Sequence, residues 1–171
     1  MLRHTVGVNK TLATFALPGA EVALRRAMVE DVPGIVGLLA ADPLGSSRES
    51  AATEADLSPY LRAFDAIDSD PAQLLLAAVR DKEVVGTLQL SFIPGLSRRG
   101  ALRAQVEAVR VHQDYRGRGL GTLVFEWAIA EARRRACALV QLTADKTRAD
   151  AHRFYESLGF VASHEGLKLQ L

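Results

Sequence analysis

The segment Arg116-Gly117-Arg118-Gly119-Leu120-Gly121 alternates glycine with larger side chains. A strand pattern precedes it and an amphipathic helical pattern follows it, which indicates a strand-to-helix turn. Glycine permits positive φ and a close approach of a ligand to the backbone. The N–H groups of such a turn and of a helix N-terminus form an anion site, and the two arginines can add charge-assisted contacts. A pyrophosphate suits this chemistry; the alternative is an ordinary turn with solvated arginines.

Two familiar phosphate-binding motifs do not match this turn. The dinucleotide fingerprint requires G-x-G-x-x-G, whereas these glycines stand at positions 117, 119 and 121. The nucleoside-triphosphate loop requires Gly-Lys-Ser/Thr, and this turn contains no lysine. Any phosphate site here is therefore of another kind.

The elements that must position the turn follow from the hydrophobic pattern of the chain. Strands are expected at residues 22–26, 73–79, 84–93, 103–112, 138–142, 160–161 and 167–171. Helices are expected at residues 31–39, 58–67, 120–135 and 149–158, and Gly159 supplies a left-handed cap to the last of these. This order predicts one α/β domain over residues 21–171, preceded by an N-terminal extension of residues 1–20.

Composition limits the classes of partner. A chain of 171 residues with a formal net charge of +1 gives no general reason to expect nucleic acid. No apolar run reaches the roughly 18 residues that a membrane span needs. Cys137 is the only cysteine and lies in an apolar run, which favours a small core residue in a reducing compartment. We expect a cytoplasmic protein that binds neither nucleic acid nor a membrane.

The glycine turn resembles the R/Q-x-x-G-x-G/A signature of the GNAT family of N-acetyltransferases. The downstream segment Phe154-Tyr155-Glu156-Ser157-Leu158-Gly159-Phe160 is similar to a second segment of that family, and the resemblance covers residues 22–171. It implies the acyl-CoA N-acyltransferase fold, a mixed, mostly antiparallel central sheet flanked by about four helices. It also implies acetyl-CoA as cosubstrate and direct transfer of the acetyl group to an amine.

The same resemblance implies roles for single residues. Glu107 corresponds to the base that deprotonates the amine through water; its alternatives are a solvated carboxylate and an ion-pair partner of Arg103 or Arg110. Tyr155 corresponds to the acid that protonates the departing thiolate; its alternative is a core aromatic. The strand around Val109 is implied to splay at a bulge and to bind the pantetheine arm through its backbone. The implied cofactor-binding set is Val109, Arg110, Val111, Arg116, Gly117, Arg118, Gly119, Leu120, Gly121, Thr122, Arg148 and Tyr155.

One position departs from the family pattern, and the histidines have simple explanations. Arg148 stands where the family often has an asparagine bonded to the pantetheine. His112 and His152 lack metal-ligand spacing, so no metal is expected. A hydrogen bond from His152 near Tyr155, three residues later, is one alternative.

The acceptor remains open on the sequence. The resemblance places it between residues 42–60 and 94–103, where Glu49, Glu54 and Asp56 could attract a cationic amine. Arg98, Arg99 and Arg103 could instead attract a carboxylate. We expect a small-molecule primary amine as acceptor. The alternatives are acetylation of a protein N-terminus or lysine, and a non-catalytic acyl-CoA-binding or sensor module. A homodimer is compatible with the resemblance.

Overall fold

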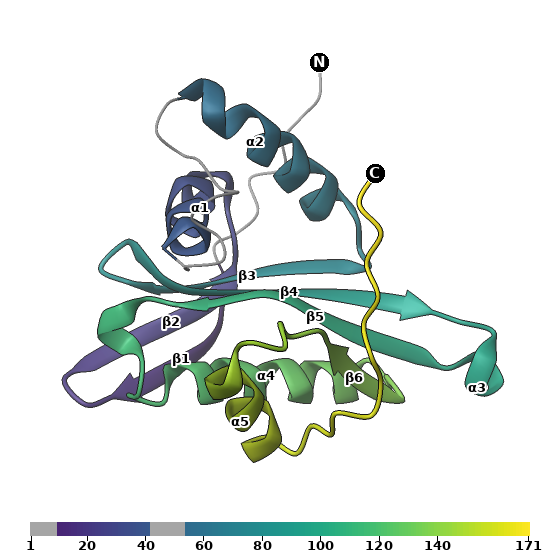
Figure 1. The fold of residues 1–171 in the computed structure, drawn as a ribbon. Coiled ribbons are helices and arrows are strands. Elements are labelled where there is room, and N and C mark those ends of the chain that lie inside the picture. The colour runs from purple at the N-terminus through teal and green to yellow at the C-terminus, as the bar shows by residue number, and fades with distance from the viewer. Residues whose placement is uncertain (1–9, 42–53) are drawn as a thin grey trace.

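The computed structural model describes residues 10–41 and 54–171, and in them a six-stranded sheet lies between two layers of helices (Figure 1). The strands are adjacent in chain order: β1 (Thr11–Leu17), β2 (Ala20–Arg26), β3 (Gln73–Arg80), β4 (Glu83–Pro94), β5 (Leu102–Val111) and β6 (Leu139–Leu142). All neighbours are antiparallel except β5 and β6, which are parallel. The expected mixed, mostly antiparallel sheet is confirmed.

Helices cover both faces of this sheet. One face carries α1 (Val32–Ala40) and α2 (Glu54–Ser69), and the other carries α4 (Leu120–Arg134) and α5 (Ala149–Ser157) (Figure 1). The short helix α3 (Ser97–Gly100) lies at the β4–β5 connection, and the 3-10 turns η1 (Val29–Asp31) and η2 (Gln113–Tyr115) precede α1 and follow β5. The unit β5–α4–β6 is the crossover that parallel neighbours require.

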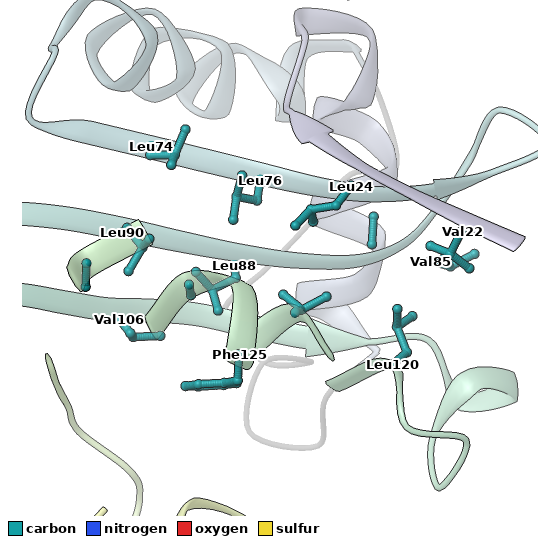
Figure 2. Packing of buried hydrophobic residues seen from close by; sticks show 14 of the residues in the cluster. Val22, Leu24, Leu74, Leu76, Val85, Leu88, Leu90, Val106, Leu120 and Phe125 are labelled. Carbon is teal, nitrogen blue, oxygen red and sulfur yellow. The ribbon is translucent and has the colours of Figure 1, made fainter. Parts of the chain in front are cut away.

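The larger core lies between the sheet and α4. Leu24, Leu76, Leu88, Leu120 and Phe125 are fully buried in it (Figure 2). A smaller cluster fills the space under α1 and α2. Because β3 contributes to both clusters, its sequence is apolar on both faces, as its near-continuous apolar run predicted. None of the helices in the described ranges is long and apolar enough to cross a bilayer.

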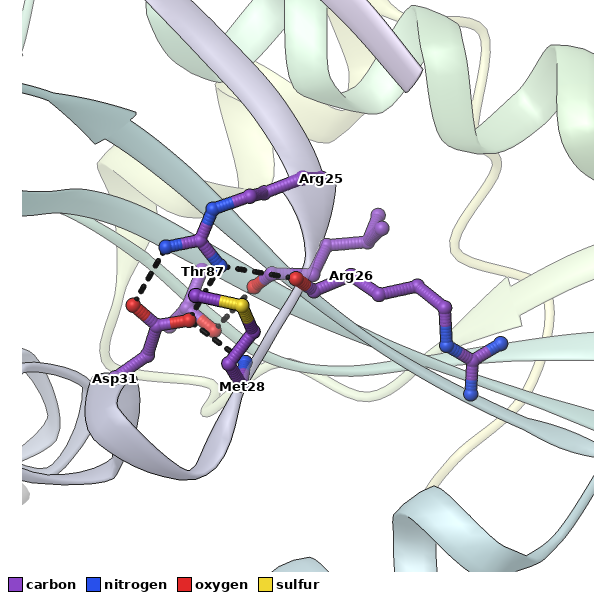
Figure 3. Close-up of polar contacts among 6 residues, drawn as sticks. Arg25, Arg26, Met28, Asp31 and Thr87 are labelled. Carbon is purple, nitrogen blue, oxygen red and sulfur yellow. Dashed lines mark hydrogen bonds and ion pairs between the residues drawn. The ribbon is translucent and has the colours of Figure 1, made fainter. Parts of the chain in front are cut away.

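A buried ion pair holds the start of α1 against β2. The Arg25 guanidinium donates to both carboxylate oxygens of Asp31, at 2.5 and 2.8 Å (Figure 3). Asp31 also accepts from the backbone N–H of Met28 at 2.7 Å, and Arg25 donates to the Arg26 carbonyl at 3.0 Å. These bonds fix the sharp turn between strand and helix, because the charged groups would otherwise be buried without partners.

Three elements differ from the sequence-based expectation. Residues 11–17 form β1 within the sheet, so the segment expected as an extension contributes a strand. Helix α2 begins at Glu54, ahead of the expected start at Ser58, and contains Pro59. Residues 160–171 contain neither of the two expected strands. The prediction of strands at 160–161 and 167–171 is wrong. The Phe160 ring packs instead on Phe125 of α4 and Tyr155 of α5, with ring centroids 6.1 Å apart in both pairs.

Candidate active site

The glycine turn connects η2 to the first residue of α4. Gly117 and Gly119 have φ of 69° and 90°, in the left-handed region that favours glycine. Gly119 caps α4, and Leu120, fully buried, anchors the first turn of the helix in the core. The backbone N–H groups at the start of α4 therefore lie beside Gly117 and Gly119, where no side chain covers the backbone. The turn has the strand-to-helix geometry that the sequence predicted, and anion binding there stays a prediction.

The arginines of the turn also bond within the chain. Arg116 Nε donates to the Val111 carbonyl at 3.1 Å, and Arg118 donates to the carbonyls of Asp114, at 3.3 Å, and of Pro18. Both side chains are exposed. Bonds to carbonyl oxygens leave the charge of a guanidinium in place, so both arginines still contribute positive potential to the turn. Their contact with phosphate stays a prediction.

A bulge interrupts β5 directly before the turn. Thr87 of β4 is opposite Arg110 and Gln89 is opposite Glu107, so one residue of β4 faces two residues of β5. Ala108 takes up the extra length with φ of 52°. The pairing of β5 with β6 ends at Val106, so among the described residues the β6-facing edge of β5 beyond Val106 has no strand partner. The expected bulge is confirmed, and β5 and β6 diverge beside the glycine turn.

The backbone of this diverging stretch is in part already bonded. The Val109 carbonyl accepts from Arg110 Nη1 at 2.7 Å, and the Val111 carbonyl accepts from Arg116. The side chains of Val109 and Val111 pack on the main core. The side chains of these valines therefore belong to the core. Pantetheine binding by their backbone remains a prediction.

Glu107 is exposed on the α1–α2 face of the sheet. It lies opposite Gln89 and belongs to the same face of β5 as Gln105 and Arg103. Arg103 is half-buried, and its Nε is buried without a hydrogen-bond partner. Four residues along a strand span about 13 Å. Glu107 and Arg103 therefore lie within reach of one small molecule on this face.

A row of polar side chains crosses the sheet beside Glu107. Gln73, Ser91, Gln105 and Gln141 are register partners on four successive strands. Gln141 donates to Gln105 at 2.7 Å, and Ser91 donates to Gln73 at 2.7 Å. The sequence analysis missed this row. Ser91, Gln105 and Gln141 stand as uncharged polar residues within largely apolar strands, but only the strand register aligns them into a row.

Tyr155 lies on the opposite face, on α5. Its ring packs on Phe125 and Phe154, with centroids 5.5 Å apart in both pairs. Burial raises the pKa of the Tyr155 hydroxyl, opposed by the positive charges of Arg148 and Arg110. The phenol is therefore protonated at neutral pH and can donate a proton. Arg148 and Arg110 lie near enough to Tyr155 to act on its charge, and a shared role of the three residues in cofactor binding stays a prediction.

The remaining candidates fall into three groups. His112 and His152 are bonded locally, to the Asp114 N–H and to the Asp145 carbonyl, which supports structural roles. Arg98 and Arg99 are exposed in α3, at the far end of the β4–β5 pair from the glycine turn (Figure 1). Glu49 and the side chains of Glu54 and Asp56 lie outside the described residues.

The remaining expectations concern Thr122 as a cofactor-binding residue and the absence of a metal site. Thr122, in the first turn of α4, is half-buried beside the glycine turn. Within residues 10–41 and 54–171, no three His, Cys, Asp or Glu side chains gather where they could hold a metal ion.

The glycine turn, the bulged strand beside it and the tyrosine on α5 are the features expected of an acyltransferase that uses an acyl-CoA. A family model described as the acetyltransferase (GNAT) family matches residues 41–160. An aminoalkylphosphonate N-acetyltransferase from Salmonella typhimurium is 30% identical over 82% of this chain and 86% of its own length. The chain belongs to the GNAT family and is an acetyl-CoA-dependent N-acetyltransferase.

Solved structures share this fold. A transcriptional regulator from Bacillus halodurans C-125 is 45% identical and superposes with a TM-score of 0.84, covering 88% of this chain and 99% of that one. A protein from Clostridium acetobutylicum, described as a predicted acetyltransferase and solved with acetyl-CoA, is 18% identical with a TM-score of 0.67. The superposition covers 87% of this chain and 96% of the Clostridium acetobutylicum protein. At that identity the likeness shows the fold.

Proposed function

We propose that this chain transfers the acetyl group of acetyl-CoA to the primary amine of a small molecule by direct attack of the amine. The observation that carries the proposal is the placement of Glu107 and Tyr155 on opposite faces of the sheet, with the Ala108 bulge between them. With this separation, a base on one face can deprotonate the attacking amine while an acid on the other face protonates the departing thiolate.

The residues of the glycine turn fit the pyrophosphate of coenzyme A. Gly117 and Gly119 leave the backbone open, the α4 N-terminus supplies N–H donors, and Arg116 and Arg118 supply positive charge. When bound, acetyl-CoA supplies a thioester carbonyl for attack and a thiolate that leaves. The edge of β5 beyond Val106 offers backbone groups to the pantetheine arm, which joins the pyrophosphate of the cofactor to its thioester.

Each chain residue then has a defined task. Glu107 takes a proton from the ammonium, directly or through water, and so leaves a neutral amine. The N–H of Val109 donates to the oxygen on which negative charge develops. Tyr155 gives its proton to the sulfur as the carbon–sulfur bond breaks. As the carbon–nitrogen bond forms and the carbon–sulfur bond breaks, the nitrogen gives its second proton to solvent. Glu107 releases its proton to solvent and Tyr155 regains one, so the products are an N-acetylated amine, free coenzyme A and one proton.

Two observations favour a small-molecule acceptor. The relative from Salmonella typhimurium is named for acetylating aminoalkylphosphonates. The polar row beside Glu107 presents amide and hydroxyl groups suited to a compact polar substrate, and Arg103 adds a positive charge on the same face. An amine that carries a phosphonate or carboxylate would match this combination.

Steady-state thiol release tests the proposal. Aminoalkylphosphonates should be acetylated, and Glu107→Gln and Tyr155→Phe should each lower kcat by roughly 100-fold while acetyl-CoA still raises Tm, because general acid–base groups contribute about 10²–10⁴ in rate. Glu126→Gln, which removes an exposed carboxylate on α4, is the matched control and should turn over normally. If acetyl-CoA neither binds in calorimetry nor shifts Tm, the proposal fails. Full turnover in Tyr155→Phe would remove the acid role.

A further inference from the structure

Tyr115 stands directly before the glycine turn and anchors it in the core. Its ring is only 8% exposed and belongs to the main hydrophobic cluster. Its N–H donates to the His112 carbonyl at 2.9 Å, and its own carbonyl accepts from the N–H of Arg118 at 3.4 Å. The 3-10 turn η2 has three residues, so the chain between β5 and the glycine turn is short. The position of the glycine turn therefore depends on where the Tyr115 ring is held.

A side chain from β3 holds the hydroxyl end of this ring. Arg80, the last residue of β3, donates from Nη1 to the Tyr115 hydroxyl at 3.1 Å. Its Nε also pairs with Asp81 at 3.3 Å. The hydroxyl of a buried tyrosine needs a polar partner, and Arg80 supplies one from 35 positions away in the chain. This bond ties η2 to the β3–β4 turn and so limits how far the glycine turn can shift.

Arg118 of the glycine turn packs on the same ring. Its guanidinium carbon lies 5.6 Å from the Tyr115 ring centroid, within the range of a cation–π interaction. Its two Nη atoms donate to the carbonyls of Asp114 and Pro18. Arg80, Tyr115 and Arg118 line one cavity of about 200 Å³. The Arg118 side chain is thus open to solvent and yet held in place, so a ligand that binds it has little further side-chain motion to order.

We propose that Arg80 and Tyr115 are positioning residues for acetyl-CoA, because they hold the backbone and the guanidinium of the glycine turn in the shape that receives the pyrophosphate. The inference rests on the proposed phosphate role of that turn. Arg80 is opposite Glu83 on β4. Gln89, the register partner of Glu107, is six residues further along β4, which corresponds to about 20 Å. Loss of the bond should therefore weaken cofactor binding and leave deprotonation of the amine unchanged.

Conservative variants of the full chain test this role by calorimetry and steady-state kinetics. Tyr115→Phe keeps the ring and removes the hydroxyl, and Arg80→Met keeps an unbranched stem and removes the guanidinium. Each should raise the Kd and the KM for acetyl-CoA by roughly 2–10-fold, the effect of one hydrogen bond, with kcat unchanged. Because both changes break the same bond, the double variant should bind as well as the weaker single variant. Lys82→Met removes an equal charge from an exposed position in the same β3–β4 turn, so this matched control should bind like wild type.

A truncated donor and a variant of the turn itself separate the possible failures. S-acetylpantetheine lacks the pyrophosphate, so its kcat/KM should be the same in wild type, Tyr115→Phe and Arg80→Met. An equal loss with both donors, or a fall in kcat with acetyl-CoA, would overturn the inference. Arg118→Met should weaken acetyl-CoA binding more than either positioning variant. If only Arg118→Met weakens binding, the positioning role is wrong and the proposed phosphate site stands, whereas a wild type that does not bind acetyl-CoA would overturn both.

Discussion

The buried pair of Arg25 and Asp31 allows a prediction whose magnitude follows from the structure. Their side chains are only 9% and 5% exposed, and Asp31 accepts both from the guanidinium and from the Met28 N–H. Asp31→Ala would leave the Arg25 charge buried, with the Arg26 carbonyl as its remaining hydrogen-bond acceptor among the described residues. Breaking a buried pair in this way costs about 3–5 kcal/mol. In a chain of this size that lowers Tm by roughly 6–20 °C.

The surface pair of Arg26 and Asp68 supplies the control. Its atoms are 3.7 Å apart and its side chains are 45% and 55% exposed, so Asp68→Ala should cost less than about 1 kcal/mol. Urea unfolding of both variants measures the difference in the free energy of unfolding. Similar losses in the two variants would refute the reasoning, because they would mean that the Arg25–Asp31 pair is not desolvated. Acetyl-CoA should still raise the Tm of Asp31→Ala, since the pair lies on the face opposite α4 and α5.

Two further predictions concern acid stability and the bulge. Hydrogen bonds from Arg134, and then from Arg135, lower the pKa of the Glu131 carboxyl against the opposing effect of burial. The Glu131 carboxylate therefore stabilises the fold fully above its pKa in the unfolded chain, which is about 4.3. This contribution is lost as the pH falls through the lower pKa of the folded state. Glu131→Gln should thus be less stable by about 1–2 kcal/mol at pH 7 and equal to wild type in strong acid, by urea unfolding; an equal gap at both pH values would contradict this. At Ala108, φ of 52° costs a non-glycine residue about 1–2 kcal/mol. Ala108→Gly should keep turnover and should not lower Tm, because relief of this strain offsets the greater freedom of glycine in the unfolded chain. Ala108→Val should lower both, and an unaffected valine variant would exclude a role for the bulge.

Local signals in the sequence predicted the parts of the site that depend on local chemistry. Gly117 and Gly119 adopt the positive φ that their alternation suggested, and Gly159 caps α5 at φ of 89°. The strand before the turn and the amphipathic helix after it also lie where periodicity placed them. These features depend on a few neighbouring residues, so the residue types alone determine them.

Features that depend on distant neighbours were harder to predict. The polar row is visible only once the register of four strands aligns Gln73 with Gln141. Residues 167–171 alternate apolar and polar side chains, as a strand would, yet they form no strand among the described residues. Alternation reports that a segment has one apolar face, but it does not say which surface covers that face. The same limit applies to residues 11–17, whose role as β1 depends on pairing with β2.

The bulge explains how one strand can serve both substrates. Up to Val106, the even-numbered residues of β5 face the α4 core, and Glu107 faces the other side. Regular alternation would place Val109 on the face of Glu107. The extra residue Ala108 instead returns Val109 and Val111 to the α4 core, beside α5 and Tyr155. The strand thereby presents a carboxylate to the face where we propose that the acceptor binds and, two residues later, backbone groups to the face of the glycine turn. This division of one strand between two faces is what a direct transfer between two separately bound substrates requires.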